Sequence, residues 1–142
     1  MPTRAEFEAA ADKFITAAYL VDQLVTAATS AGAAQILRGG SLGRQVPQRI
    51  EAAQHTARTC HQTIVEAADT CIERAAIIAD YETLLANYDI SYGYFERASK
   101  AWAAEFNAWF LDETGTIEQP RDAPHPPSRP TPPPNWAEVR RP

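Results

Sequence analysis

A seven-residue repeat of apolar side chains holds its phase for about sixty residues, which limits this chain to a helical architecture. Positions seven apart are Ile50, Ala57, Ile64, Cys71, Ile78, Leu85, Tyr92, Ser99 and Phe106, and those three residues on are Ala53, Cys60, Ala67, Arg74, Tyr81, Tyr88, Phe95, Trp102 and Trp109. Such a stripe is typical of a helix that packs lengthwise on another helix. At about 1.5 Å per residue it would be on the order of 90 Å long, more than the N-terminal part of the chain can cover. We therefore expect the remainder to need a partner.

Composition narrows the class of protein. The 142 residues carry a net charge of −5, with 45% apolar and 22% charged side chains, as in an ordinary globular domain. This charge gives no electrostatic footprint for nucleic acid. The first ten residues lack an apolar core and do not form a conventional secretory signal, and no stretch is apolar enough to span a membrane.

The N-terminal third predicts a first helix. Thr3 followed by Glu6 forms a capping box, so we expect the helix to begin there. Apolar residues then recur along one face, many of them alanines that allow close approach of a second helix but bury little area. The glycines at Gly39–Gly40 mark the reversal of an antiparallel helical hairpin.

The second helix is expected from about Val46 to the Thr114–Gly115 stop signal. The segment Asn87–Gly93 is its weak point, because it is rich in poor helix formers. A break there would create a third helix over Ser91–Asp112 that folds back on the stripe. The heptad phase passes through the segment without a slip, which favours a continuous or kinked helix.

The last part of this helix is strongly aromatic, and aromatic side chains dominate the energetics of protein interfaces. The sequence gives two interpretations: an intramolecular aromatic core, or a docking surface for another helical protein in a hetero- or homodimer. We expect the docking surface, formed by Ile78, Tyr81, Leu85, Tyr88, Tyr92, Phe95, Trp102, Phe106 and Trp109. Arg74 is the charged residue of the heptad stripe. Its side chain can snorkel to the edge of the helix interface, or pair with a carboxylate across that interface and set the register of the two helices.

The chain changes character near its C-terminus, where nine of the eleven prolines lie in 120–142. Such a segment cannot form a helix or a core of its own and samples polyproline II. We expect two parts: a helical domain over 1–116 and a disordered proline-rich tail over 117–142. Trp136 is unusual in a polar tail and suggests a short motif that docks a partner.

The sequence offers no set of residues for catalysis. The three histidines do not share metal-ligand spacing, and zinc-protease, phosphate-loop and nucleophile-elbow motifs are absent from it. Carboxylates on the second helix lie off the stripe and read as solvated faces. We expect a non-enzymatic protein with no cofactor and no metal site.

The alanine-rich hairpin, the glycine-bearing turn and the lack of a conventional signal resemble the WXG100-like proteins, including EspC-like members, of actinobacterial type VII secretion systems. Ser41-Leu-Gly-Arg and Cys71-Ile-Glu-Arg-Ala-Ala-Ile-Ile-Ala-Asp-Tyr resemble the second-helix pattern of that group. Tyr92 and Glu96 fit its Y-x-x-x-D/E export signal, one helical turn apart. The turn has no tryptophan, Leu42–Gly43 being the nearest equivalent, and the helix continues beyond the signal.

The resemblance implies a secretion substrate or substrate partner, exported by a signal-peptide-independent route or cytoplasmic before export. Two alternatives stay open. A phage or cellular structural adaptor that self-associates as a helical bundle would show the same seam. So would a non-secreted partner or chaperone of a helical toxin domain.

Overall fold

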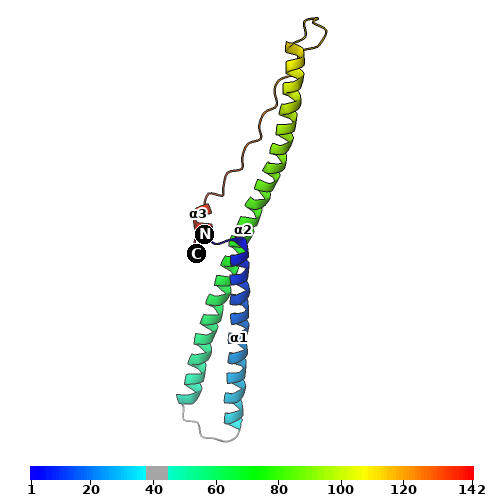
Figure 1. Cartoon of the computed structure of the whole chain (residues 1–142). Helices are drawn as coiled ribbons and strands as arrows, with labels where there is room; N and C mark the ends of the chain where they lie inside the picture. Colours follow the sequence, from blue (N-terminus) through cyan, green and yellow to red (C-terminus); the bar gives the residue numbers. More distant parts are fainter. Residues whose placement is uncertain (38–44) are drawn as a thin grey trace. The chain divides into compact units, whose positions relative to one another are not determined.

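The computed structural model describes the backbone of residues 1–37 and 45–142, and their side chains except 28, 31–37 and 45–47. These ranges contain three helices, α1 (Arg4–Leu37), α2 (Gln45–Phe110) and α3 (Trp136–Val139), and no strand (Figure 1). The predicted all-α class is therefore confirmed. The predicted reversal at Gly39–Gly40 lies outside the described residues.

The chain divides into two compact units. Unit 1 comprises Met1–Ile78 together with Ala137–Pro142, and unit 2 comprises Ala79–Trp136. Helix α2 contributes to both units, and so do the proline-rich C-terminal residues. Each unit is therefore described by itself.

Helix α1 begins at the predicted capping box. The backbone N–H of Thr3 donates to Glu6 Oε2 at 2.6 Å, and the backbone N–H of Glu6 donates to Thr3 Oγ1 at 3.3 Å. These reciprocal bonds satisfy donors that the first turn of a helix leaves unpaired. Bonding to the Thr3 backbone N–H, and then to its hydroxyl, also lowers the pKa of Glu6.

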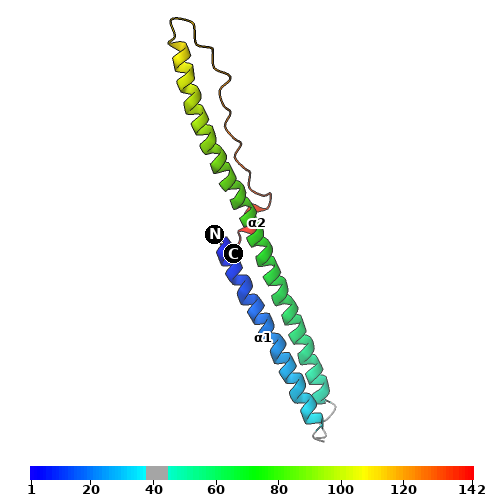
Figure 2. The same ribbon diagram turned by 90° about the vertical axis from the view of Figure 1, so that its right-hand side faces the viewer.

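In unit 1, α1 and the first part of α2 lie side by side and antiparallel, as the predicted helical hairpin (Figures 1 and 2). The buried apolar side chains of this pair are Phe7, Ala11, Ala18, Ala68, Ala75 and Ile78. Since most are alanines, the helices can approach closely but remove little apolar surface from water. Gln54 Nε2 on α2 donates to Thr29 Oγ1 on α1 at 2.7 Å and adds a polar link between the helices.

Helix α2 passes through Asn87–Gly93 without interruption, which confirms the continuous helix and excludes the separate third helix over Ser91–Asp112. The ring of Tyr92 explains how the weak segment is supported. Its centroid lies 5.9 Å from that of Tyr88 and 5.7 Å from that of Phe95, one turn away on either side. Aromatic contacts of this kind offset the low helix propensity of the residues between them.

The regular helix ends at Phe110, and a compact turn follows instead of further helix. Asp112 organises this turn: its Oδ2 accepts from the backbone N–H of Ile117 at 2.7 Å, and its Oδ1 accepts from the backbone N–H of Thr114 at 2.9 Å. Gly115 adopts a φ of 66°, a left-handed conformation that glycine reaches at low steric cost. The predicted stop signal at Thr114–Gly115 therefore lies within the turn, a few residues past the end of the helix.

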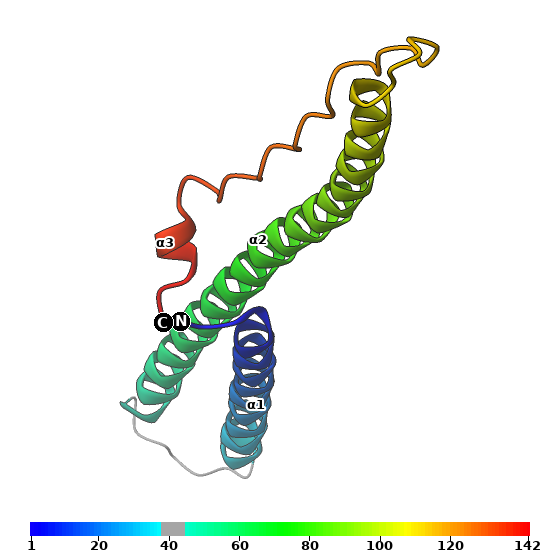
Figure 3. The same cartoon turned by 45° about the horizontal axis from the view of Figure 1, so that its top comes forward.

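Beyond this turn the chain runs back along the second part of α2 within unit 2 (Figures 1 and 3). Three tail residues contact the aromatic side chains of α2: Arg121 and Pro130 through hydrogen bonds, and Trp136 through its ring. The short helix α3 lies in this segment, for which the sequence predicted no helix. Disorder of the tail stays a prediction.

Candidate functional site

The predicted docking residues of unit 2 lie in one heptad phase on α2, with Ser99 between Phe95 and Trp102, and are here called the aromatic face. It consists of Tyr81, Leu85, Tyr88, Tyr92, Phe95, Trp102, Phe106 and Trp109. Tyr81 is buried at 9% exposure, Tyr92 is 39% exposed, and the other six are half-buried. Ile78, the ninth predicted residue, is buried and belongs to unit 1.

Neighbouring rings support one another along this row. The centroids of Trp102 and Phe106 are 5.1 Å apart with nearly parallel planes, and those of Phe106 and Trp109 are 5.5 Å apart. Each pair is three or four residues apart, the spacing that places side chains on the same helical face. The row is therefore a pre-arranged apolar surface held by one rigid helix.

The C-terminal tail lies on the aromatic face and is held by hydrogen bonds at two levels. The indole Nε1–H of Trp102 donates to the backbone carbonyl of Arg121, and the hydroxyl of Tyr81 donates to the carbonyl of Pro130 at 3.4 Å. The later helix residue contacts the earlier tail residue, so the tail runs antiparallel to α2. Each donor sits on the rim of an aromatic ring, which lets the ring bury its apolar surface while the polar atom finds a partner.

The spacing of these two bonds fits a polyproline II segment beside an α-helix. Tyr81 and Trp102 are 21 residues apart in the sequence, which corresponds to about 32 Å of α-helix. Pro130 and Arg121 are nine residues apart, which corresponds to about 28 Å of polyproline II. The two lengths are close enough for side chains to bridge the difference, so both bonds form in one extended arrangement.

Burial along the tail follows the period of polyproline II. Within 124–136 the half-buried residues are Pro124, Pro127, Pro130, Pro133 and Trp136, and the two residues between each successive pair are exposed. A polyproline II helix has three residues per turn, so the four prolines share one face. That face is the one turned toward α2. Trp136 follows a turn, in which its backbone N–H donates to the carbonyl of Pro133 at 3.0 Å, and it begins α3.

Trp136 ends the docked segment. Its ring centroid lies 4.8 Å from that of Tyr81, with the ring planes inclined by 60°. Tilted rings at this separation are a favourable aromatic pair. The sequence predicted Trp136 as a docking residue for a partner, and within unit 2 it docks on the chain's own α2.

The turn before the tail carries the most perturbed carboxylate of the described residues. Bonds from the Thr114 hydroxyl, and from backbone N–H groups led by that of Ile117, lower the pKa of Asp112 to about 2. A carboxylate that accepts several hydrogen bonds is stabilised in its charged form. Asp112 is therefore ionised at neutral pH and fixes the direction in which the tail leaves α2.

The residues of the predicted export signal lie on one uninterrupted stretch of α2. Tyr92 and Glu96 are four residues apart, and both are exposed. Because the helix does not break between them, their spacing of about one turn is preserved. Tyr92 also belongs to the aromatic face, so the predicted signal and the docking surface overlap.

Arg74 lies in unit 1 and is half-buried, and its guanidinium contacts two other parts of the chain. Its Nη1 donates to the backbone carbonyl of Arg141 at 2.8 Å, and its guanidinium carbon lies 5.6 Å from the centroid of the Phe7 ring. A guanidinium over an aromatic face makes a cation–π contact. Arg74 thus ties the first turn of α1 and the last residues of the chain to α2.

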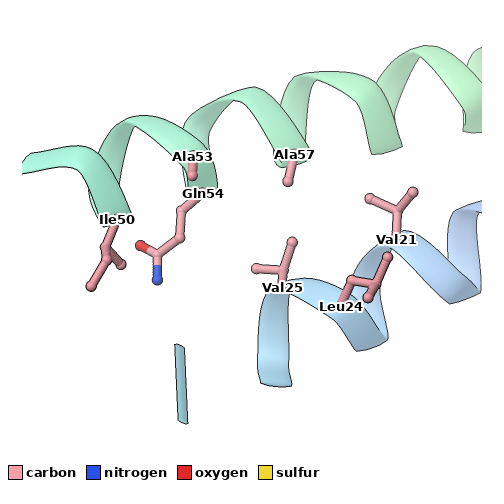
Figure 4. Close-up of a pocket in the computed structure, with 7 residues that line it drawn as sticks. All are labelled: Val21, Leu24, Val25, Ile50, Ala53, Gln54 and Ala57. Atoms are coloured by element: carbon pink, nitrogen blue, oxygen red, sulfur yellow. The ribbon is translucent and has the colours of Figure 1, made fainter. Parts of the chain in front are cut away.

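An apolar groove between the helices of unit 1 has a volume of about 280 Å³ (Figure 4). Its walls are Val21, Leu24 and Val25 from α1 and Ile50, Ala53, Gln54 and Ala57 from α2. Figure 4 shows side chains of both helices pointing into the space between them, where the alanines leave it open. None of the described side chains in its walls is titratable, so these residues offer no groups for acid–base chemistry.

Among the described residues, no group of three or more His, Cys, Asp or Glu side chains could hold a metal ion. No helix in the described ranges is long and apolar enough to cross a membrane. Comparisons with protein-family models, with curated proteins and with solved structures found no match for this chain. Function is therefore inferred from the geometry of the aromatic face.

The contacts of the tail residues with this face were not predicted from the sequence. Four prolines and Trp136 recur at intervals of three over 124–136. That period, set beside a row of aromatic side chains of matching length, is the signal that would have predicted their packing. The prolines were predicted to prevent a helix and to sample polyproline II, but the apolar surface that they carry was left out of that prediction.

Proposed function

We propose that this chain is a non-enzymatic association protein that binds a helical partner through its aromatic face. The observation that carries the proposal is the row of eight side chains in one heptad phase on a single rigid helix. A heptad row of this kind is the surface that helices use to pack lengthwise on one another. Within unit 2, which is fully described, an extended tail lies on this row where a second helix would be expected.

Apolar exposure elsewhere in unit 2 supports the proposal. Leu84 and Phe110 on α2 are exposed, with Phe110 at 72%, and the helical period places both beside the aromatic face. Single exposed apolar residues are common on proteins, but large ones beside an aromatic row are typical of an interaction surface. The tail therefore leaves part of the apolar surface of unit 2 in contact with water.

The most specific form of the proposal is a substrate, or substrate partner, of a type VII secretion system. It is supported by the helical hairpin of unit 1 and by the preserved spacing of Tyr92 and Glu96 on α2. On this proposal the chain is exported without a conventional signal peptide, or stays in the cytoplasm until export. Its partner is another helical protein, in a hetero- or homodimer.

A second candidate is a phage or cellular structural adaptor that self-associates as a helical bundle. The observation that favours it is on α1, where Tyr19, Leu20 and Leu24 are exposed, the last at 70%. A bundle of two hairpins would bury such side chains. The genes next to this one discriminate between the candidates, because a secretion ATPase would favour export and virion genes would favour the adaptor.

The association proposal is tested with the double variant Trp102→Ala, Trp109→Ala. It should lose at least about 2 kcal/mol of association free energy, because buried tryptophans are frequent hot spots. The matched control is Ile90→Ala with Tyr94→Ala, which removes exposed side chains outside the row. Circular dichroism should show helix retained in both variants. Loss of all helicity in the tryptophan variant would instead indicate that the row is an intramolecular core.

The export proposal is tested separately with Tyr92→Ala. This change should block secretion in a host that carries the matching secretion system, while the helical content stays unchanged. Tyr94→Ala is the control, since it removes a neighbouring exposed tyrosine outside the motif. Normal secretion of the Tyr92 variant would refute the assignment.

A further inference from the structure

The aromatic face satisfies the two chemical requirements of a polyproline II ligand. A polyproline II backbone makes no internal hydrogen bonds, so its carbonyls need outside donors. The Tyr81 hydroxyl and the Trp102 indole N–H supply donors to the carbonyls of Pro130 and Arg121. Aromatic rings flanked by such donors are the usual means by which proteins recognise proline-rich segments.

The turn at the end of α2 favours docking of the tail on its own helix. Asp112 accepts backbone N–H bonds from both Thr114 and Ile117, and Gly115 takes the left-handed conformation that reverses the chain. A segment held at such a short tether has an effective concentration on the order of millimolar at its site. The tail therefore has an advantage over the same sequence offered by another molecule.

The docked tail nevertheless stays only partly buried. Pro124, Pro127, Pro130 and Pro133 are half-buried, and the residues between them are exposed. Segments with little buried apolar surface open at low free-energy cost, while the rest of the fold persists. The contacts of the tail thus fit a ligand that can leave, more than a permanent wall of a core.

Two side chains of the aromatic face are needed both by the tail and by the proposed partner helix. Tyr81 and Trp102 contact the tail, and both belong to the row that a partner helix would bury. We propose that the aromatic face is a polyproline II-binding surface occupied by the chain's own residues 121–136, which must leave before a partner helix can bind. The requirement that the tail leave before a partner binds rests on the association function proposed above. Docking of the tail on the aromatic face does not depend on that function.

The first test follows the indole N–H resonance of Trp102 in the full-length chain labelled with [¹⁵N]tryptophan. The variant Pro130→Ala, Trp136→Ala removes two side chains that face α2. The control Pro132→Ala, Asn135→Ala removes two exposed neighbours, including one proline, from the same segment. The Trp102 resonance should move toward that of a solvent-exposed indole in the first variant and stay in place in the control. An unmoved resonance in both, or an equal shift in both, would overturn the docking.

The second test adds a synthetic peptide of residues 118–142 to the weakened variant. At about 1 mM peptide, the order of the effective concentration of a short tether, the Trp102 resonance should return toward its original position. In the wild-type chain the unlabelled peptide must displace the tail, which is read from the labelled Trp136 indole resonance, and this should need about tenfold more peptide because the tail competes. Equal response of the two chains, or no response of the weakened one, would refute a displaceable internal ligand.

These outcomes are separable from those of the association tests, because no partner helix is present in either experiment. If the tail docks and exchanges but the chain never associates with a partner, only the proposed association function is refuted. If the chain associates with a partner but the tail does not dock, only the proposal of an internal ligand is refuted.

Discussion

The rings of Tyr81 and Trp136 lie with their centroids 4.8 Å apart, although 55 positions separate the two residues in the sequence. Tyr81 also donates to the carbonyl of Pro130, so it holds the tail by its ring and by its hydroxyl. A single side chain of α2 thus anchors the C-terminal part of the docked segment. It is also the most buried member of the aromatic face.

Replacing Trp136 by Ala should therefore loosen the tail. We expect the free energy of unfolding of unit 2 to fall by about 1–2 kcal/mol, from the lost ring pair and the lost apolar burial. Urea unfolding, followed by the fluorescence of Trp102 and Trp109, measures this change. Trp136→Phe keeps a ring at the position and should recover at least half of the loss. Equal stability of wild type and the alanine variant would contradict the anchor.

The turn after α2 should weaken in acid. The folded-state pKa of Asp112 is about 2, below the ordinary value of 3.8, so the charged carboxylate stabilises the turn at any pH above about 4. That contribution is lost as the pH falls from about 4 through about 2. Asp112→Asn should remove the pH dependence from this window. An NMR titration of the Asp112 carboxyl and of the Ile117 amide measures both effects, and a midpoint near 4 would refute the hydrogen-bonded cap.

Arg74→Leu should release the last residues of the chain from α2. The variant loses the bond to the Arg141 carbonyl and the cation–π contact with Phe7, which together contribute about 1 kcal/mol. Hydrogen exchange at the Arg141 amide, which donates to the carbonyl of Glu138, should accelerate about fivefold. Arg74→Lys keeps the positive charge but loses the planar guanidinium. Its exchange rate at the Arg141 amide should lie between those of the wild type and Arg74→Leu. Unchanged exchange in Arg74→Leu would show that Arg74 does not hold this segment.

The two described glycines beyond the hairpin should respond in opposite directions to alanine. Gly93 lies inside α2, and a Cβ added there would meet no atom within 4 Å. Gly93→Ala should raise stability by about 0.5–1 kcal/mol through helix propensity. Gly115→Ala should lower it by about 1 kcal/mol, because its φ of 66° is strained for a residue with a Cβ. Thermal unfolding measures both, and destabilisation by Gly93→Ala would contradict a regular helix at that position.

Periodic features of α1 and α2 could be predicted from the sequence because they depend on local spacing. The capping box at Thr3 and Glu6 is a four-residue pattern with one physical outcome, and it forms as expected. The continuity of α2 through Asn87–Gly93 followed from the unbroken heptad phase, since a loop rarely conserves such a phase. These features need no knowledge of distant contacts.

Long-range contacts were harder to predict. Proline-rich segments are usually solvated, and nothing within 120–136 reveals that a row of aromatic rings lies beside it. The proline-rich segment repeats every three residues, and the aromatic row of α2 repeats every seven. Only the similar total lengths of these two segments indicate that Trp136 meets Tyr81 and that Arg121 meets Trp102. Arg74 was uncertain for a similar reason, because its acceptor is a backbone carbonyl near the end of the chain. A side-chain pattern does not encode such an acceptor.

Solution mass by light scattering, with and without the proteins encoded by neighbouring genes, tests most directly whether the aromatic face is an association surface. We expect a dimer or a complex with a neighbour, and its loss in the variant Trp102→Ala, Trp109→Ala. A stable monomer that ignores its neighbours would contradict the proposal. It would leave the aromatic face as the packing surface for residues 121–136 alone.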